Sequence, residues 1–326
     1  MSKVAVFGAG SWGTAFSVVL ADAGNDVTLW ARREELCATI NEKRENTDYL
    51  PGIDLPDSVQ ATHDADIVIF ATPSQTFRTN LDDWAAHIPS TAVMVSLMKG
   101  VELGTSKRMS EVIAEVTGAA PDRVAVISGP NLAKEIASRE PAASVVACPD
   151  EENVKRLRAL CHSATFRPYS STDVVGCELG GAYKNVIALA VGMAVGLGFG
   201  DNTTASVITR GLAETARLAA GFGADPMTLM GLAGLGDLVA TCSSPLSRNR
   251  TFGEKLGRGM TTEEITSSTR QVAEGVKTAS SLLALAQRAE IYAPIVEAVH
   301  AVVEGEMTAA DMLTALISKE TKHERD

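Results

Sequence analysis

Short apolar runs rich in β-branched residues alternate with helix-like stretches through the first half of the chain. These runs lack the alternation of apolar and polar positions that a half-exposed strand would show, and they lie at residues 4–7, 26–30, 66–70, 93–97, 123–127 and 143–147. Strands that are apolar on both faces are covered by helices on both sides. The pattern therefore predicts an α/β fold with a mostly parallel, doubly wound sheet.

The second half of the chain has a different composition and a different periodicity. After about residue 173, Ala, Leu, Gly, Glu and Met dominate, and apolar positions such as Leu282, Leu285 and Ala286 recur at helical spacing. A chain of 326 residues is long enough for about two domains. We therefore predict an α/β domain over residues 1–172 and an all-helical domain over residues 173–326.

The net charge of the chain and the length of its apolar run restrict the kinds of partner that it can bind. The formal net charge is −11, and no cluster of Lys and Arg is longer than Arg32-Arg33, which disfavours nucleic acid and anionic membrane surfaces as partners. The apolar run at residues 186–199 is shorter than the ~20 residues that a bilayer requires. We expect a buried core helix there and no stable membrane insertion.

Cysteine and histidine spacing indicates the compartment and disfavours a metal. The five Cys form no Cys-x-x-Cys pair and leave an odd one over, which is typical of free thiols in a reducing, cytoplasmic compartment. The adjacent pair Cys161-His162 would be a poor chelate, and no other His stands at ligand spacing from a Cys or a second His. We expect no metal site.

A glycine-rich turn directly follows the first predicted strand and opens a helix. It reads Gly8-Ala9-Gly10-Ser11-Trp12-Gly13. The first glycine permits the tight turn, the second lets backbone approach a pyrophosphate, and the third allows close packing of helix on strand. The free N–H groups of the helix start would face the phosphates. This placement favours a Rossmann-type dinucleotide site over a glycine-rich turn without a ligand.

The residues after the second predicted strand indicate which dinucleotide is bound. An acidic residue at this place would accept a hydrogen bond from the ribose 2′-OH of NAD, but the chain has Arg32-Arg33 here. Guanidinium groups suit a 2′-phosphate, and cations at a helix start otherwise oppose the helix dipole. We expect NADP(H), with NAD(H) open as a second cofactor. The alternative is a pair of solvated cations balanced by Glu34 and Glu35.

Two further polar blocks, Lys99-Gly100 and the run Ser128 to Glu135, follow later predicted strands, at the sheet edge where ligands of open α/β sheets bind. The predicted helical half adds Gly180 to Asn185 inside its first helix, and then Ala233 to Leu238, Thr241-Cys242 and Ser247 to Arg250. With the glycine turn, Tyr49 to Gly52 and Gln271 to Gly275, these blocks make nearly the whole chain resemble the bacterial NAD(P)-dependent glycerol-3-phosphate dehydrogenases.

The resemblance implies roles for individual residues. Lys184 would exchange the proton at the substrate C2 oxygen, and Lys99 would contact both substrate and cofactor. The other implied substrate contacts are Gly129, Asn131, Asp237, Ser247, Arg248 and Asn249. The implied cofactor contacts, beyond Gly8, Gly10 and Gly13 of the turn, are Ser11, Trp12, Arg32, Arg33, Tyr49, Ala133, Arg248, Val272 and Glu274. Many members carry Ser or Thr where this chain has Asn131, whose amide can also donate and accept hydrogen bonds.

Chemistry supports several of these roles independently. A lysine ammonium can stabilise charge on the C2 oxygen and deliver a proton if its pKa is lowered, which a nearby Lys99 would promote. Asp237 would orient that ammonium, or it would be only the N-cap of a helix beginning at Leu238. Arg248 can grip phosphate oxygens, with Ser247 and Asn249 as neutral donors, unless this run is an exposed polar loop.

The sequence thus predicts a cytoplasmic oxidoreductase, a homodimer by family resemblance. It would convert dihydroxyacetone phosphate and NAD(P)H reversibly to sn-glycerol 3-phosphate for glycerophospholipid synthesis. One alternative is a 3-hydroxy acid dehydrogenase of the same layout, which would need a carboxylate clamp. Another is a non-catalytic NADP(H) sensor, which would not need both Lys99 and Lys184.

Overall fold

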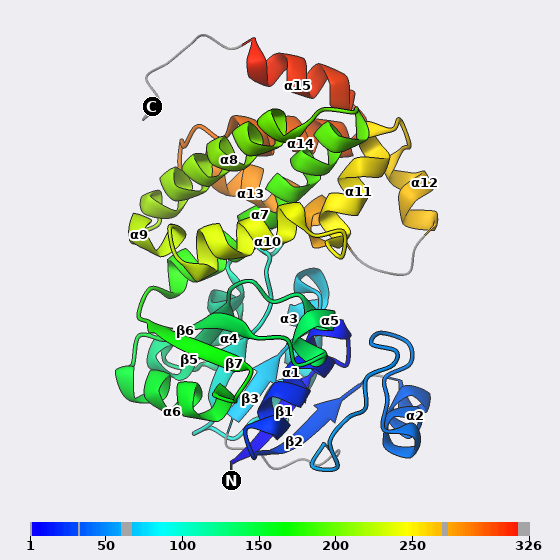
Figure 1. Ribbon diagram of the computed structural model, residues 1–326. Helices are drawn as coiled ribbons and strands as arrows, with labels where there is room; N and C mark the ends of the chain where they lie inside the picture. The colour runs from blue at the N-terminus through cyan, green and yellow to red at the C-terminus, as the bar shows by residue number, and fades with distance from the viewer. Residues whose placement is uncertain (1, 32, 60–66, 269–272, 319–326) are drawn as a thin grey trace.

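One seven-stranded sheet forms the lower layer of the protein in Figure 1, which shows a computed structural model describing residues 2–31, 33–59, 67–268 and 273–318. The strand order is β2-β1-β3-β4-β5-β6-β7. The strands are β1 (Lys3–Phe7), β2 (Asp26–Trp30), β3 (Ile67–Phe70), β4 (Val93–Ser96), β5 (Val124–Ser128), β6 (Ala142–Ala147) and β7 (Phe166–Ser171). All neighbours pair in parallel except β5 and β6, which are antiparallel.

Helices cover both faces of this sheet, as the buried character of its strands requires. One face packs against α1 (Ser11–Asp22), α2 (Glu34–Lys43), α5 (Ala133–Ala137) and α6 (Glu151–Cys161). The other packs against α3 (Phe77–Trp84) and α4 (Met109–Thr117). The predicted doubly wound, mostly parallel sheet is confirmed.

Strand β7 is the one strand of this sheet that the sequence pattern did not predict. It is an edge strand, paired only with β6 on its inner side. Its residues alternate between buried and exposed, and it contains Pro168, which an edge strand tolerates because one side of its backbone needs no ladder hydrogen bonds. A polar strand that contains a proline lacks the apolar run that identified the others.

The upper layer is built from helices alone, as predicted for the second half. They are α7 (Val174–Gly196), α8 (Asp201–Gly221), α9 (Pro226–Leu229), the π-helical turn η4 (Leu232–Gly236), α10 (Asp237–Ser243), α11 (Arg248–Gly257), α12 (Thr262–Ser267), α13 (Glu274–Arg288), α14 (Pro294–Val303) and α15 (Ala309–Ile317). Helix α7 is central in this layer (Figure 1). It is long and apolar enough to span a bilayer, but 83% of its apolar window is buried inside the protein, so the expected core helix is confirmed.

Helices α7 and α11 approach each other at backbone distance. A Cβ atom added at Gly192 would lie 2.1 Å from the carbonyl oxygen of Arg250, and one added at Gly253 would lie 2.1 Å from that of Leu189. No side chain larger than hydrogen fits at such separations. The glycines therefore fix the position of α11, which begins with Arg248, relative to α7, which carries Lys184.

A buried carboxylate joins the helical layer to the sheet layer. Glu178 of α7 accepts hydrogen bonds from Arg108 Nη1 at 2.7 Å, from the Ser110 backbone N–H at 2.8 Å and from Ser110 Oγ at 2.6 Å. Burial raises the pKa of Glu178, whereas Arg108 and the Ser110 bonds act to lower it. A buried carboxylate needs such partners, so this contact ties α7 to the start of α4.

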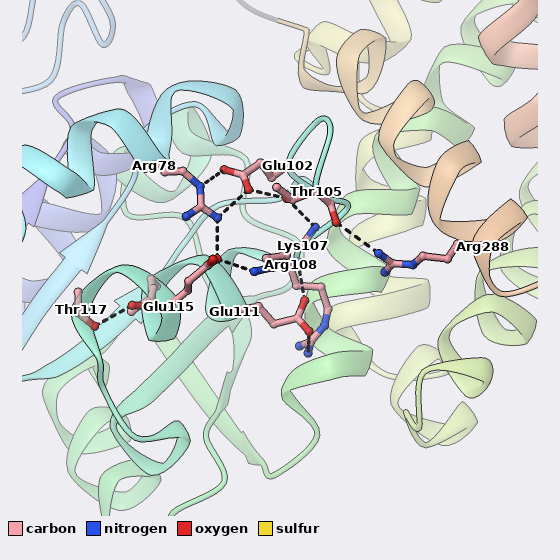
Figure 2. A network of polar contacts seen from close by, with 10 residues as sticks. Arg78, Glu102, Thr105, Lys107, Arg108, Glu111, Glu115, Thr117 and Arg288 are labelled. Carbon is pink, nitrogen blue, oxygen red and sulfur yellow. Dashed lines mark hydrogen bonds and ion pairs between the residues drawn. The ribbon is translucent and has the colours of Figure 1, made fainter.

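The loop between β4 and α4 is held by contacts to both layers of the protein (Figure 2). Arg78 of α3 binds Glu102 through two hydrogen bonds of 2.9 Å and reaches Glu115 of α4 at 2.8 Å. Arg288 of α13 donates to the Thr105 carbonyl at 3.4 Å. Because Lys99 lies at the start of this loop, the network holds its backbone from the sheet layer and from the helical layer.

The close contact between α7 and α11 predicts the effect of one methyl group. Gly253→Ala should lower the free energy of unfolding by about 2 kcal/mol, because the new Cβ meets backbone that can move only by separating the helices. Urea unfolding followed by circular dichroism measures this. Gly221→Ala is the matched control, since its Cβ would meet only the end of the Ile291 side chain, which can rotate away. Equal unfolding midpoints for the two variants would contradict the prediction.

Candidate active site

The glycine turn between β1 and α1 has the shape that a pyrophosphate requires. Gly8 has φ of 120°, and a Cβ at Gly13 would lie only 1.9 Å from the Gly8 carbonyl oxygen. A Cβ at Gly10, by contrast, would meet no atom of the described residues within 4 Å. The turn is therefore closed toward the protein and open at Gly10, where backbone N–H groups at the start of α1 can face phosphate.

Polar groups at the start of α1 also fit a dinucleotide. The Trp12 Nε1 donor is buried and finds no hydrogen-bond partner within the described parts of the chain. A buried, unpaired donor is costly unless a ligand satisfies it. Ser11 Oγ donates to the Tyr49 carbonyl at 2.9 Å, which brings Tyr49 to the same turn. These features fit a dinucleotide along the carboxyl edge of β1 and β2.

Arg33 is the N-cap residue of α2, three residues after the end of β2. Its guanidinium forms an ion pair with Asp48 and lies 6.0 Å from the centre of the Tyr49 ring. The partner that the structure gives Arg33 is thus Asp48, which the sequence did not indicate. Arg32 and Val272, two further predicted cofactor contacts, lie outside the described residues.

Two lysines and one aspartate meet where the helical layer faces the carboxyl edge of the sheet. Lys99 Nζ donates to Asp237 Oδ2 at 2.5 Å and to the Gly129 carbonyl at 2.8 Å. Lys184 Nζ lies 3.4 Å from Asp237 Oδ1. The side chains of Lys99, Asp237 and Lys184 are only 14%, 2% and 12% exposed. The structure thus brings four of the predicted site residues into one cluster.

Burial sets the protonation of Lys184. The pKa of this ammonium is lowered to about 8, because the lowering by burial, to which Lys99 adds, outweighs the raising by Asp237. The effect expected from Lys99 is present, but it is smaller than the effect of burial. An amine with a pKa near 8 can both release and take up a proton close to neutral pH.

Asp237 does not act as an N-cap, so that alternative was wrong. Helix α10 begins at Asp237 itself after Gly236, and the carboxylate turns toward the two lysines. A buried carboxylate is stable here because two cations surround it. The cluster keeps one net positive charge, which favours an anionic or developing oxyanion ligand.

Thr241 is a member of this cluster to which the sequence analysis gave no role. Its Oγ1 accepts a hydrogen bond from Lys184 Nζ at 2.8 Å and lies 3.3 Å from Asp237 Oδ1. The signal was available, because a residue four positions after Asp237 lies on the same face of a helix. Together with Asp237 it fixes the direction of the Lys184 side chain.

Two asparagines connect the lysine cluster to the other helices. Asn185 Nδ2 donates to the Lys99 carbonyl at 3.0 Å, and Asn249 Nδ2 donates to Asn185 Oδ1 at 2.8 Å. Asn249 Oδ1 in turn accepts from the Gly275 backbone N–H at 2.9 Å. Asn249, a predicted substrate contact, therefore uses much of its amide to hold α7, α11 and α13 together. Asn185 was not predicted to have this role.

The predicted phosphate-gripping run forms the first turn of α11. Ser247 is the N-cap of this helix and accepts from the Arg250 backbone N–H at 3.2 Å, while Arg248 is its first residue and is exposed. Since Ser247 and Asn249 are buried, the alternative of an exposed polar loop was wrong. The start of the helix, where Arg248 lies, supplies backbone N–H groups that have no partner within the helix.

Glu274 and the residues after β5 complete the site. Glu274, at the start of α13, accepts from Ser74 Oγ at 2.6 Å, and burial raises the pKa of its carboxyl. Asn131 Nδ2 donates to Ser144 Oγ at 3.1 Å, and its buried Oδ1 has no partner among the residues that the structure describes. Ala133 is the first residue of α5. In the sheet order, Ser74 follows β3, between the strands that precede the glycine turn and Lys99, whereas Asn131 and Ala133 follow β5 on the far side of Lys99.

The described parts of the chain contain no group of three or more His, Cys, Asp or Glu side chains that could hold a metal ion. All five cysteines fall within those parts, and each is free.

Comparison with known proteins matches both halves of the chain. Family models described as the N-terminus and the C-terminus of NAD-dependent glycerol-3-phosphate dehydrogenase match residues 3–154 and 173–314. A glycerol-3-phosphate dehydrogenase [NAD(P)+] of Streptomyces griseus is 61% identical over 99% of this chain and 98% of its own. One of Thermobifida fusca is 59% identical over 100% and 99%. The crystal structure of glycerol-3-phosphate dehydrogenase from Coxiella burnetii has a TM-score of 0.92 at 35% identity, covering 98% of this chain and 99% of that chain.

The lysine cluster predicts a measurable titration. The Lys184 amine should titrate with a midpoint of about 8, and Asp237→Asn should move this midpoint lower, because the carboxylate raises the pKa of Lys184. NMR of lysine labelled with ¹³C at Cε, assigned with Lys184→Met, measures both values. Asp201→Asn, which removes an exposed carboxylate at the start of α8, is the control and should leave the midpoint unchanged. A midpoint that rises in Asp237→Asn would contradict the electrostatic assignment.

Proposed function

The chain belongs to the family of NAD-dependent glycerol-3-phosphate dehydrogenases, and on this premise we propose that it interconverts dihydroxyacetone phosphate and sn-glycerol 3-phosphate with NAD(P)H. Lys184 is the residue that exchanges the proton at the C2 oxygen. The observation that carries the proposal is the buried Lys184, with a pKa of about 8, beside Asp237 and Lys99 at the carboxyl edge of the sheet. The reaction serves glycerophospholipid synthesis.

The lysine cluster performs the protein's part of the chemistry. NAD(P)H, when bound, supplies the hydride that reduces C2 of the ketone. Negative charge develops on the C2 oxygen, and the ammonium of Lys184 stabilises it and donates a proton. Asp237 and Thr241 hold Lys184 Nζ at 3.4 and 2.8 Å, so the ammonium needs little rearrangement when the charge develops. Lys99 adds a second cation on the other side of Asp237.

The far end of the substrate is a phosphate, and the start of α11 suits it. Arg248 can bind two phosphate oxygens through its guanidinium, and the first turn of the helix contributes backbone N–H groups and a favourable dipole. Asn131, with its unpaired Oδ1, can accept from a substrate hydroxyl. Gly129 has φ of 149°, and a Cβ there would lie 3.0 Å from Ser144 Oγ, so glycine suits the position whose carbonyl accepts from Lys99.

A bound NAD(P)H would be held along the glycine turn. Gly8, Gly10, Gly13, Ser11 and Trp12 would contact its pyrophosphate, and Ala133 at the start of α5, which packs in the same cluster as Trp12, would contact it as well. Arg32, Arg33 and Tyr49 would hold the adenosine end, and Arg248, Val272 and Glu274 would hold the nicotinamide end. Both NADP(H) and NAD(H) are accepted.

We infer that the chain is divided into two domains. Residues 1–172 form the dinucleotide-binding domain and residues 173–326 the substrate-binding domain, with the division between the end of β7 at Ser171 and the start of α7 at Val174. The enzyme is a cytoplasmic homodimer without nucleic-acid partners or stable membrane insertion.

A 3-hydroxy acid dehydrogenase is less well supported because the site residues match a phosphate clamp. A non-catalytic sensor would not require the buried Lys184 and Lys99.

Turnover should depend on the phosphate of the substrate. Purified protein should oxidise NADPH or NADH with dihydroxyacetone phosphate and only very slowly with unphosphorylated dihydroxyacetone, as followed by absorbance at the nicotinamide band. Arg248→Met should raise the KM for dihydroxyacetone phosphate by about tenfold or more, because a bidentate charged contact is lost. Binding of NADPH without turnover would overturn the proposed reaction and favour the sensor.

The direction of the reaction decides the sign of its pH dependence. Reduction needs the Lys184 ammonium, so kcat/KM for dihydroxyacetone phosphate should be level below pH of about 8 and fall above it. Oxidation of glycerol 3-phosphate needs the neutral amine, so its kcat/KM should rise up to that pH and then level off. Lys184→Met should lower kcat by about 10²- to 10⁴-fold in both directions. Identical pH profiles for the two directions would remove Lys184 from the proton transfer.

A further inference from the structure

The guanidinium assigned to the adenosine end of the cofactor is already paired with an acid. Arg33 Nη2 forms an ion pair with Asp48 Oδ2, and the side chains of Arg33 and Asp48 are 49% and 47% exposed. The hydrogen bond that Arg33 donates to Asp48 is the main cause that raises the pKa of Arg33. The carboxylate thus occupies one of the donor positions that a phosphate would use.

Asp48 is held in place by its own turn, independently of Arg33. Asn46, which is fully buried, donates to the Ala9 carbonyl at 3.0 Å and to Thr14 Oγ1 at 2.8 Å. The Leu50 backbone N–H returns to the Asn46 carbonyl at 2.8 Å, which closes the turn. The neighbouring Tyr49 carbonyl accepts from Ser11. The hydrogen bonds of Asn46, Tyr49 and Leu50 therefore hold the Asp48 backbone beside the glycine turn and the first turn of α1.

Arg33 reaches the same place from a different element. Strand β2 pairs in parallel with β1, with Phe7 opposite Trp30, and the Gly8 N–H donates to the Trp30 carbonyl at 3.1 Å. Arg33 follows three residues later and is the N-cap residue of α2. A cation and an acid from separate segments are therefore brought together on one side of the phosphate turn, where the adenosine ribose of a dinucleotide belongs.

We propose that Asp48 sets the preference between NADPH and NADH by competing with the 2′-phosphate for Arg33. This inference rests on the proposed function. NADPH carries a 2′-phosphate, so its binding must displace the carboxylate from Arg33 and place two anions near each other. NADH carries a hydroxyl at the same position and leaves the ion pair intact. Asp48 therefore weakens the binding of one cofactor and leaves that of the other unchanged.

Asp48→Asn tests this competition, because it removes the charge and keeps the shape of the side chain. Dissociation constants are measured by titrating the nicotinamide fluorescence of NADPH and of NADH, without substrate. The variant should bind NADPH about fivefold more tightly than the natural protein, and the gain should shrink in high salt. Its affinity for NADH should be unchanged. The probe 2′,5′-ADP should show the same gain, and 5′-ADP should show none.

Asp57→Asn is the matched control. Asp57 is fully exposed, and its Oδ1 lies 3.8 Å from Nε of Arg44, so the substitution changes the net charge equally without touching Arg33. It should leave both affinities unchanged. In an Arg33→Met background, Asp48→Asn should lose most of its effect on NADPH, because the group for which the two anions compete is gone.

The outcomes separate this inference from the proposed function. Saturable NADPH binding by the natural protein, with no gain in Asp48→Asn, leaves the proposed function standing and overturns the role of Asp48. Weaker NADPH binding in Asp48→Asn, weaker NADH binding, or an equal gain in Asp57→Asn would also overturn it. A natural protein that binds neither NADPH nor 2′,5′-ADP would overturn the dinucleotide site and this inference together.

Discussion

An ammonium group in an apolar helix must have a counterion, and much of the site is arranged to supply one. Lys184 lies in α7, the most buried helix of the protein, where an unpaired charge would be costly. Asp237 from α10 and Thr241 one turn later provide the partners, and Lys99 from the sheet edge shares the same carboxylate. Three separate segments therefore have to meet at one carboxylate. Gly180 and Gly181 of α7 permit this approach, since a Cβ at Gly180 would lie 2.7 Å from the Ala233 carbonyl oxygen and one at Gly181 would lie 3.2 Å from Lys99 Cγ.

The sequence predicted those parts of the structure whose physical cause is local. Buried strands, the glycine turn and the helical second half all follow from the periodicity of apolar positions and from backbone requirements, and each is present. The resemblance to glycerol-3-phosphate dehydrogenases, based on blocks spread along the chain, is confirmed by family models that match both halves. Strand β7 was missed because an edge strand needs neither a continuous apolar run nor a full set of ladder bonds.

The parts that the sequence could not predict depend on contacts between distant segments. Asp237 was open between a helix cap and a counterion, since both readings suit an acid after glycine, and only the approach of Lys99 decides between them. Asp48 gave no signal, because its role depends on a turn anchored by Asn46 to the glycine turn. Asn185 and Asn249 read as ordinary polar residues until their mutual hydrogen bond places them between three helices. Such pairings span 37 to 138 residues of chain and leave no periodic trace.

Helix α7 belongs to both layers of the protein. Its first turns, at Val174 and Cys177, pack with Val126 of β5 and Ala147 of β6, and the rest of it forms the centre of the helical core. The helix is therefore one continuous rigid element whose first turns pack against the sheet. A hinge motion that separates the two layers would have to bend this helix or break its contacts with β5 and β6. The height of the Lys184 amine above the sheet is thus fixed by the folded protein itself, before any ligand arrives.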